Sequence, residues 1–230
     1  MSNSAQTSAS NRINALLDEN SFVEVGAYIT ARNTDFNMTS RETPADGVVT
    51  GYGTIEGCLV YVYSQDASVL GGSIGEMHAK KIVNLYAAAM KTGAPVIGLI
   101  DCAGLRLQEA TDALDGFGQL YLSQTMASGV IPQISAVFGT CGGGMAAVAS
   151  LADFVIADSS RGELYVLPES GKSDRQGVKR ASLYAEGTEG LAAKTRELLA
   201  YLPENSSEGT VYTVAPEDIN VPAEGVEDLV

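Results

Sequence analysis

The sequence of 230 residues contains a single histidine and only three cysteines. The cysteines, at positions 58, 102 and 141, are too few and too widely separated to form a disulfide framework. Together with one histidine they also make no plausible zinc site, so we predict no metal centre. A reducing compartment, the cytoplasm, is the simplest expectation for such a chain.

Basic residues are scarce as well: 14 lysines and arginines stand against 28 acidic residues, for a formal net charge of −14. This excess argues against nucleic acid or an anionic membrane as a partner, because both are negatively charged. It does not exclude an anionic substrate if the few basic residues lie beside it. No apolar run approaches the roughly 20 residues of a membrane-spanning helix. The first residues also lack the basic and then apolar pattern of a signal peptide, so we expect no membrane span.

The remaining composition is that of a globular protein, with 45% hydrophobic residues and enough length for one domain with a sizeable core. Residues 1–10 are small and polar, and we expect them to be mobile. Residues 11–203 carry the apolar patterns of a folded domain. Residues 204–230 combine many acids with little apolar periodicity, which predicts an acidic tail or linker.

Strand and helix patterns alternate within the predicted domain, which indicates an α/β fold with crossover connections between strands. The turn Glu56-Gly57 between two β-rich runs predicts a hairpin. The expected elements are helices over 11–18, 74–91, 107–126 and 190–202, an extended piece over 21–25, a hairpin over 47–64, strands over 96–100, 130–138 and 162–168, and a polar loop over 170–179.

A short glycine-rich stretch, Gly71-Gly72-Ser73, precedes the second predicted helix. We interpret it as a turn that ends in a helix N-cap. A helix start of this kind can bind a phosphate group, although a plain N-cap explains the residues equally well. Lys81 is a candidate to assist that phosphate, and solvation at the surface is the alternative for its side chain.

Three successive glycines, Gly142, Gly143 and Gly144, follow the last central strand and precede a run of methionine and alanine that predicts a helix. A strand that stops at a glycine turn before a helix leaves N–H groups of the first helical turn unpaired. Without Cβ atoms a ligand oxygen can approach them closely, and the helix dipole adds partial positive charge. The pattern indicates an oxyanion hole. A tight turn that needs small residues for packing accounts for it equally well.

Longer stretches carry a family resemblance: LLDENSFVEVG, ADGVVTGYGTIEG, VYVYSQDASVLGGSIGEMHAKKI and GAPVIGLIDCAGLRLQEATDALDGFGQ, in this order before GTCGGGMA. They resemble the carboxyltransferase β-subunits of biotin-dependent acyl-CoA carboxylases and decarboxylases, with propionyl-CoA carboxylase and the glutaconyl-CoA and methylmalonyl-CoA decarboxylases as nearest kin. The resemblance covers roughly residues 11–157 and returns at 198–206. It implies the crotonase (ClpP-like) fold, a ββα-type superhelix, and the acyl-CoA-binding, N-terminal half of the carboxyltransferase.

The resemblance also implies a site and a set of partners. The substrate would be a coenzyme A thioester, whose enolate is stabilised by backbone amides at Gly143 and Gly144, with Gly104 as a further contributor. Biotin would be carried by a separate biotin carboxyl carrier protein, and its ureido anion would take the α-proton, so that no side-chain base is required. A nearly histidine-free chain fits this chemistry. The predicted substrate-binding residues are Gly71, Gly72, Ser73, Lys81, Ala103 and Gly142.

Two departures from the family pattern bear on assembly. Family chains carry two such domains in tandem, whereas this sequence stops near the point where the second would begin. Between Ile156 and Leu198 it is also shorter, without the histidine-containing glycine-rich stretch that is usual there. We therefore expect the N-terminal half as a separate subunit or a truncated chain. A C-terminal-type carboxyltransferase subunit is the expected partner, in a hetero-oligomer.

Other polar residues have simpler interpretations than catalysis. We expect packing roles for His78, Cys102 and Cys141, and structural roles for Asp101 and Asp153; Arg106 and Gln108 are expected to fix the loop after Gly104. Glu109 is the one obvious carboxylate for a crotonase-type hydratase or isomerase. That activity, a biotin-independent acyl-CoA decarboxylase and a non-catalytic assembly subunit are the alternative functions.

Overall fold

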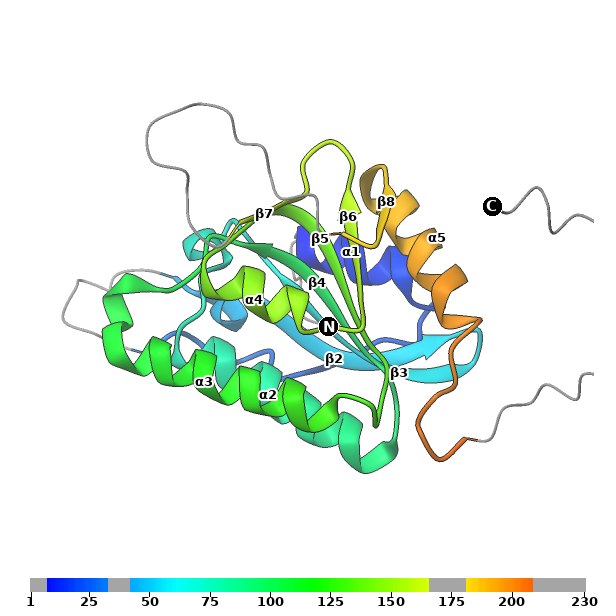
Figure 1. The fold of residues 1–230 in the computed structure, drawn as a ribbon. Coiled ribbons are helices and arrows are strands. Elements are labelled where there is room, and N and C mark those ends of the chain that lie inside the picture. Colours follow the sequence, from blue (N-terminus) through cyan, green and yellow to red (C-terminus); the bar gives the residue numbers. More distant parts are fainter. Residues whose placement is uncertain (1–7, 33–41, 166–180, 209–230) are drawn as a thin grey trace, which may run out of the picture.

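An eight-stranded sheet organises residues 8–32, 42–165 and 181–208, the part of the chain that the computed structural model describes (Figure 1). The strands lie in the order β1-β2-β3-β4-β5-β6-β8, and β7 pairs with the end of β5. β1 to β3 pair antiparallel, and every pairing from β3 onward is parallel. Their bounds are β1 (Val23–Val25), β2 (Val48–Ile55), β3 (Cys58–Gln65), β4 (Val96–Cys102), β5 (Gln133–Gly142), β6 (Phe154–Asp158), β7 (Glu163–Tyr165) and β8 (Leu183–Ala185).

Helices cover both faces of this sheet, and a separate hydrophobic core lies under each layer. On one face α2, α3 and α4 pack with Ile82, Phe117 and Met145 among their buried residues. On the other face α1 and α5 pack through Ile13 and Leu191. The helix bounds are α1 (Ser8–Leu16), α2 (Glu76–Thr92), α3 (Ala110–Ala127), α4 (Gly144–Ser150) and α5 (Gly187–Leu199), and the short 3-10 turns are η2 (Pro44–Gly47), η3 (Leu70–Gly72) and η4 (Leu107–Glu109). The predicted α/β class is confirmed.

The predicted hairpin is confirmed, and its turn explains its register. Glu56 and Gly57 both have positive φ, at 53° and 84°, as a two-residue turn between right-twisting strands requires. Ile55 therefore pairs directly with Cys58. The Asp18 carboxylate accepts hydrogen bonds from the N–H groups of Glu56 and Gly57, and these bonds hold the pKa of Asp18 well below its usual range.

Two predicted boundaries need correction. α1 begins at Ser8, and Ala9 is fully buried, so residues 8–10 belong to the packed body; residues 1–7 lie outside the described part. At the other end, the Asn205 side chain donates to the carbonyl of Gly93, and the N–H of Ser206 donates to the carbonyl of Val130. Packing thus continues past residue 203. Most of the predicted tail, 209–230, lies outside the described residues, as does the predicted loop over 170–179.

The start of α2 also differs from the prediction. The helix begins at Glu76 with Gly75 as its N-cap residue, and Ser73 lies in an extended conformation before it. The Ser73 hydroxyl donates to the carbonyl of Leu70 and caps no helix.

Among the described residues, no helix is long and apolar enough to cross a membrane.

Candidate active site

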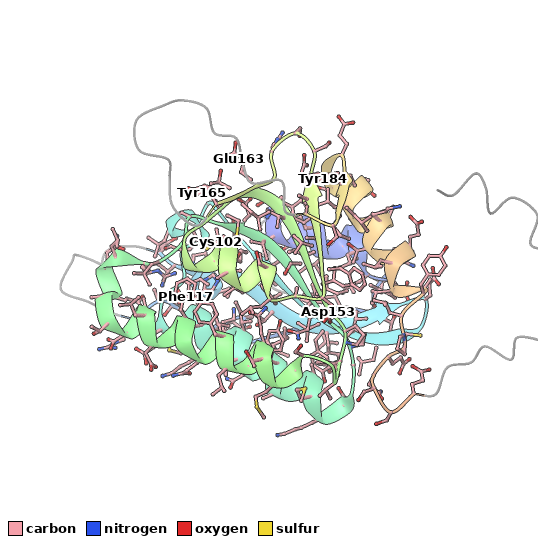
Figure 2. The ribbon with its side chains drawn as sticks, in the orientation of Figure 1. Cys102, Phe117, Asp153, Glu163, Tyr165 and Tyr184 are labelled. Carbon is pink, nitrogen blue, oxygen red and sulfur yellow. The ribbon has the colours of Figure 1, made fainter. Side chains whose placement is uncertain are left out.

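The glycines singled out in the sequence come together where β4 and β5 end. Cys102 of β4 and Cys141 of β5 are direct neighbours across the sheet. Just beyond them, a Cβ added to Gly104 would lie 3.3 Å from the carbonyl oxygen of Gly142. Figure 2 shows Cys102, Tyr165 and Phe117 around this end of the sheet. A side chain at position 104 would thus make a tight contact with this carbonyl, and the φ of 108° at Gly104 also favours glycine.

Gly143 turns the chain from β5 into α4, and its amide is already used. Its φ of 60° and ψ of −131° suit glycine alone among the residues. Its N–H donates to the carbonyl oxygen of Tyr165 at 2.9 Å, which continues the pairing of β5 with β7. The predicted role of Gly143 as an oxyanion donor is therefore not supported by this geometry. Gly143 sets the turn, and a Cβ there would meet no atom of the described residues within 4 Å.

The amides that follow are different. Within the described residues, the N–H groups of Gly144 and Met145, in the first turn of α4, have no hydrogen-bond acceptor. The Tyr121 hydroxyl donates to the carbonyl of Gly144 at 3.0 Å and fixes this peptide. A Cβ on Gly144 would lie 3.1 Å from both Phe117 and Tyr121. Packing therefore favours a glycine at 144. The oxyanion hole stays a prediction, and among the described residues the unpaired donors that it requires begin at Gly144.

Gly104 lies beside this turn and is held on its other side. It has a φ of 108°, and its carbonyl accepts from the N–H of Ile74 at 2.9 Å. Among the described residues, its own N–H has only the sulfur of Cys102, at 3.3 Å, as acceptor, and sulfur is a weak acceptor. The neighbouring Ala103 N–H donates to the carbonyl of Gly71. Of the two, Gly104 has the amide that a ligand oxygen could recruit.

The predicted phosphate cradle at Gly71-Gly72-Ser73 is not formed. The N–H of Gly72 donates back to the carbonyl of Val69, and that of Ser73 donates to the carbonyl of Leu70, so both are used within and beside η3. Gly72 is needed because a Cβ there would lie 2.3 Å from the carbonyl of Asp101. These residues pack against the end of β4 and so support the strand end at the candidate site.

The start of α2 is likewise occupied. The N–H of Glu76 donates to the carboxylate of Glu109 at 2.6 Å. A carboxylate at a helix N-terminus satisfies the free donors and the dipole there. A phosphate would have to displace it against two negative charges, Glu76 and Glu109. The phosphate-binding prediction for this helix start is therefore corrected.

Lys81 is buried and does not face a ligand. Its amine donates to the carbonyl of Ala45 at 2.8 Å and to that of Val48. Burial lowers the pKa of Lys81 to about 8. The lysine fastens η2 to α2, and neither the phosphate nor the solvated surface role holds. The sequence contained the signal, because Lys81 follows His78 by three residues and precedes Leu85 by four, on the buried stripe of α2.

Arg106 fixes the loop after Gly104, as predicted, through a fully buried ionic cluster. Its guanidinium contacts the carboxylates of Asp46 at 2.5 Å and Glu109 at 2.9 Å, and donates to the carbonyl of Ser73 at 2.7 Å. Desolvation raises the pKa of Asp46 and the Arg106 charge opposes that rise. Sequence reasoning missed Asp46, which lies 60 positions from its partner.

The remaining candidates for acid–base or nucleophilic chemistry are packed away. His78 is fully buried, one ring nitrogen on the carbonyl of Asp46 and the other on the Gln65 amide. Burial, reinforced by the Arg106 charge, lowers its pKa to about 3. Burial also raises the pKa of the Cys102 thiol to about 12 and that of Cys141 still higher, which removes thiolate reactivity at neutral pH. The packing roles predicted for these three residues are confirmed.

The candidate site therefore consists of backbone amides beside glycine-lined strand ends, in a fold that is the crotonase-type architecture of carboxyltransferases. Residues 3–169 match the model of the family described as the carboxyl transferase domain, and the chain belongs to that family.

Relatives and solved structures agree with this assignment. The chain is 41% identical to the methylmalonyl-CoA decarboxylase subunit alpha of Veillonella parvula, over 87% of this chain and 43% of the relative. It is 43% identical to the propionyl-CoA carboxylase beta chain of Roseobacter denitrificans, over 82% and 36%. The transcarboxylase 12S structure with methylmalonyl-coenzyme A bound superposes with a TM-score of 0.83 at 36% identity, over 87% of this chain and 42% of that one. The chain thus spans less than half the length of these relatives.

Proposed function

We propose that this chain is the acyl-CoA-binding part of the carboxyltransferase of a biotin-dependent acyl-CoA carboxylase or decarboxylase. In this role it binds the coenzyme A thioester and stabilises the enolate that forms during carboxyl transfer. The names of the relatives, which are carboxylase and decarboxylase subunits acting on acyl-CoA, support the substrate class. The observation that carries the proposal is the pair of amides at Gly144 and Met145, which have no acceptor among the described residues, beside the turn at Gly143.

These amides suit a reaction in which negative charge develops on a thioester oxygen. Donors fixed before the reaction stabilise such charge without having to reorganise, and each is worth about 3–4 kcal/mol in comparable sites. In this structure two hydrogen bonds fix the peptide units of the turn. Tyr121 holds the Gly144 carbonyl, and β7 holds the Gly143 amide. The proposed donors are Gly144 and Met145, with the weakly bonded Gly104 amide as a further candidate.

The side chains around the turn fit a reaction that needs no acid or base from this chain. Glu109, the candidate acid of a hydratase, is buried and bonded to both Arg106 and the N-terminus of α2. The two thiols are protonated and His78 is neutral within the core. Biotin, when bound, supplies or takes up the carboxyl group. The residues of this chain bind the thioester and hold its oxygen against the amides.

Partners follow from the length of the relatives. The matched part is less than half of each relative, so the proposed complex includes a C-terminal-type carboxyltransferase domain beside this one. It also includes a biotin carboxyl carrier protein, which makes the functional unit a hetero-oligomer. In this arrangement the chain alone binds acyl-CoA and transfers no carboxyl group.

The test is reconstitution. The purified chain, a C-terminal-type carboxyltransferase chain and a biotinylated carrier are combined, and decarboxylation of malonyl-CoA and methylmalonyl-CoA is followed. We expect turnover only with all three components. No turnover of either thioester by an assembled complex would contradict the proposal. Turnover by this chain alone, without biotin, would assign a biotin-independent decarboxylase instead.

A matched pair of variants tests the amide at 144 within that assay. Gly144→Ala and Gly144→Pro both place a Cβ against Phe117 and Tyr121, but only proline deletes the N–H. Proline is tolerated at the first position of a helix. We expect Gly144→Pro to be slower than Gly144→Ala by about a hundredfold in kcat. Equal turnover by the two variants would remove Gly144 from the donors.

A further inference from the structure

Gln65, the last residue of β3, is fully buried and uses both ends of its side-chain amide. Its Oε1 atom accepts the N–H of Asp101 at 3.3 Å. Its Nε2 atom lies 3.1 Å from Nε2 of His78 and donates to the sulfur of Met145 at 3.9 Å. These three partners belong to β4, α2 and α4. One side chain therefore connects the end of β3 to a neighbouring strand and to two helices that cover the same face of the sheet (Figure 1).

Two other glutamines are buried in the same way, and neither is so fully bonded. Gln124 and Gln133 are 1% and 0% exposed, and the Oε1 atom of each has no hydrogen-bond partner among the described residues. A buried polar group that is left unpaired costs free energy. Every polar side-chain atom of Gln65, by contrast, has a partner. The surroundings of Gln65 are therefore matched to an amide, and its partners show what the amide holds in place.

The proton on His78 gives this amide a single orientation. The ring is neutral, because burial lowers the pKa of His78 to about 3. Its Nδ1 atom lies 2.9 Å from the carbonyl oxygen of Asp46, which can only accept, so Nδ1 carries the proton. The bare Nε2 atom can then only accept, so Gln65 must present its NH2 group to the ring. The Oε1 atom of Gln65 is thereby directed to the N–H of Asp101.

Gln65 lies where the regular pairing of its strand ends. The pairing of β3 with β4 stops at Ser64 and Leu99. Beyond that point the Gln65 side chain continues the connection between the two strands, because it accepts the N–H of Asp101. Asp101 comes three residues before Gly104, whose weakly bonded amide is a candidate donor of the site. The glutamine thus fixes the strand end from which that amide extends.

The same side chain reaches the sulfur to which Gly104 donates. Burial raises the pKa of the Cys102 thiol to about 12, and hydrogen bonds from the Gly104 N–H and from the Gln65 side chain oppose that rise. The Gly104 N–H lies 3.3 Å from this sulfur. On the other side, the sulfur of Met145 belongs to the first turn of α4. Gln65 therefore contacts both segments that carry the candidate donors.

We propose that Gln65 is a positioning residue of the candidate active site, which sets where the amides of Gly104 and Met145 lie relative to each other. Its effect on catalysis rests on the proposed function, in which these amides are donors to the thioester oxygen. Gln65 itself touches no substrate and transfers no proton. It acts through the end of β4 and through the side chain of Met145. Such placement matters because a donor stabilises the developing charge only at the right distance and angle.

The orientation of the amide is tested first, on the chain by itself. His78 is the only histidine in the sequence, so a proton–nitrogen NMR correlation of the ¹⁵N-labelled chain contains a single imidazole. We expect the proton on Nδ1 and a bare Nε2 that accepts from Gln65. In Gln65→Met the Nε2 signal should shift, because its donor is lost. A proton on Nε2 in the parent would overturn the proposal, since Gln65 would then turn its oxygen to the ring and could not accept from Asp101.

Turnover of the reconstituted complex is measured next. Gln65→Met keeps the length of the side chain and removes its amide. We expect kcat to fall about tenfold or more with KM nearly unchanged, because misplaced donors weaken binding of the transition state. The control is Gln133→Met, the same substitution at a buried glutamine where β5 begins, which donates to the carbonyl of Gln124. It removes a buried hydrogen bond far from the glycine turn, so kcat should stay that of the parent.

The outcomes separate this proposal from the proposed function. Parental kcat in a folded Gln65→Met, or equal losses of kcat in Gln65→Met and Gln133→Met, would overturn the role of Gln65. A parent complex without turnover would instead contradict the proposed function, and the role of Gln65 in catalysis would fall with it. The ring-nitrogen measurement still decides the orientation of the amide in that case, because it needs neither partner chains nor substrate.

Met145→Leu is the second variant, and it tests the path through the sulfur. Leucine conserves the volume and the backbone amide of Met145 and removes only the acceptor of Gln65, so the fold should be kept. We expect kcat to fall several-fold. Combined with Gln65→Met, the loss should be smaller than the product of the two separate factors, because residues that act through one contact are not additive. Parental kcat in Met145→Leu, or factors that multiply in full, would overturn the proposed coupling.

Discussion

Two helices on the same face of the sheet begin at a glycine, and only one of them has its N-terminus capped. α2 starts after Gly75, and the Glu109 carboxylate accepts the N–H of Glu76. α4 starts after Gly143, and within the described residues nothing accepts the amides of Gly144 and Met145. In α2, a side chain of the same chain thus accepts a hydrogen bond from the free N-terminal donors of the helix. The start of α4 leaves donors that bind a substrate oxygen in the proposed function, so under that proposal one helix start stabilises the fold and the other serves the chemistry.

The largest effect is expected at the capped end. Arg106→Leu leaves the carboxylates of Asp46 and Glu109 buried without a cation. Breaking a buried ion pair in this way costs about 3–5 kcal/mol, which is a large part of the stability of a typical domain. We expect a loss of that size in the free energy of unfolding, measured with urea.

Arg32→Leu is the control for Arg106→Leu. Arg32 also contacts two carboxylates, those of Glu76 and Asp112, but its side chain is 49% exposed. Ion pairs exposed to solvent contribute about 0–1 kcal/mol. Equal losses in the two variants would show that the buried cluster is not what holds the start of α2.

Glu109→Gln sharpens the comparison because it keeps the shape of the cap and removes its charge. Hydrogen bonds to charged groups contribute about 1.5–3 kcal/mol, so we expect a loss of unfolding free energy in that range. Turnover of the reconstituted complex should stay within about tenfold of the parent. A catalytic acid or base contributes about a hundredfold to ten-thousandfold, so a loss of that size with the fold intact would favour the hydratase or isomerase chemistry.

The two ends should also differ in their response to pH. Burial lowers the pKa of His78 in α2 to about 3 from an ordinary value of 6.5, and the nearby charges of Arg106 and Lys81 act in the same direction. Between pH 6.5 and 3 the unfolded chain therefore binds a proton that the folded chain does not. Stability is fully present above pH 6.5 and falls by about 1.4 kcal/mol for each pH unit below it.

The measurement is urea unfolding at pH 7 and at pH 5, with His78→Gln as the control that has no titrating ring. The slope assigned to His78 should disappear in that variant. A parent protein that is equally stable at both pH values would contradict the buried neutral state of the ring. The amides at the start of α4 do not titrate, so they contribute nothing to the slope.

Local sequence patterns predicted the hairpin at Glu56-Gly57, the strand–helix alternation and the glycine turn, because each depends on residues close together in the chain. They failed where the decisive contact comes from far away. Gly71-Gly72-Ser73 looked like a helix start, yet the cap of α2 is Glu109, 33 residues from Glu76. Gly143 looked like a free donor until β7 provided the Tyr165 carbonyl. A single sequence gives no register for such contacts.

The smallest expected effect lies at the uncapped end, at Tyr121. Its hydroxyl donates to the carbonyl of Gly144, and that carbonyl shares a peptide unit with the N–H of Met145. A bond to the carbonyl orients the whole unit and polarises its N–H. Tyr121→Phe keeps the ring packed against Gly144 and removes only this bond, so unfolding free energy should fall by about 1 kcal/mol. If the Met145 amide binds the thioester oxygen, kcat should fall several-fold with KM nearly unchanged, because the donor acts on charge that develops in the transition state.

The matched control is Thr125→Val, which removes a hydroxyl that donates to the carbonyl of Tyr121 one turn further along α3. A lower kcat in Thr125→Val than in Tyr121→Phe, or a rise in KM alone, would show that the start of α4 does not depend on the tyrosine.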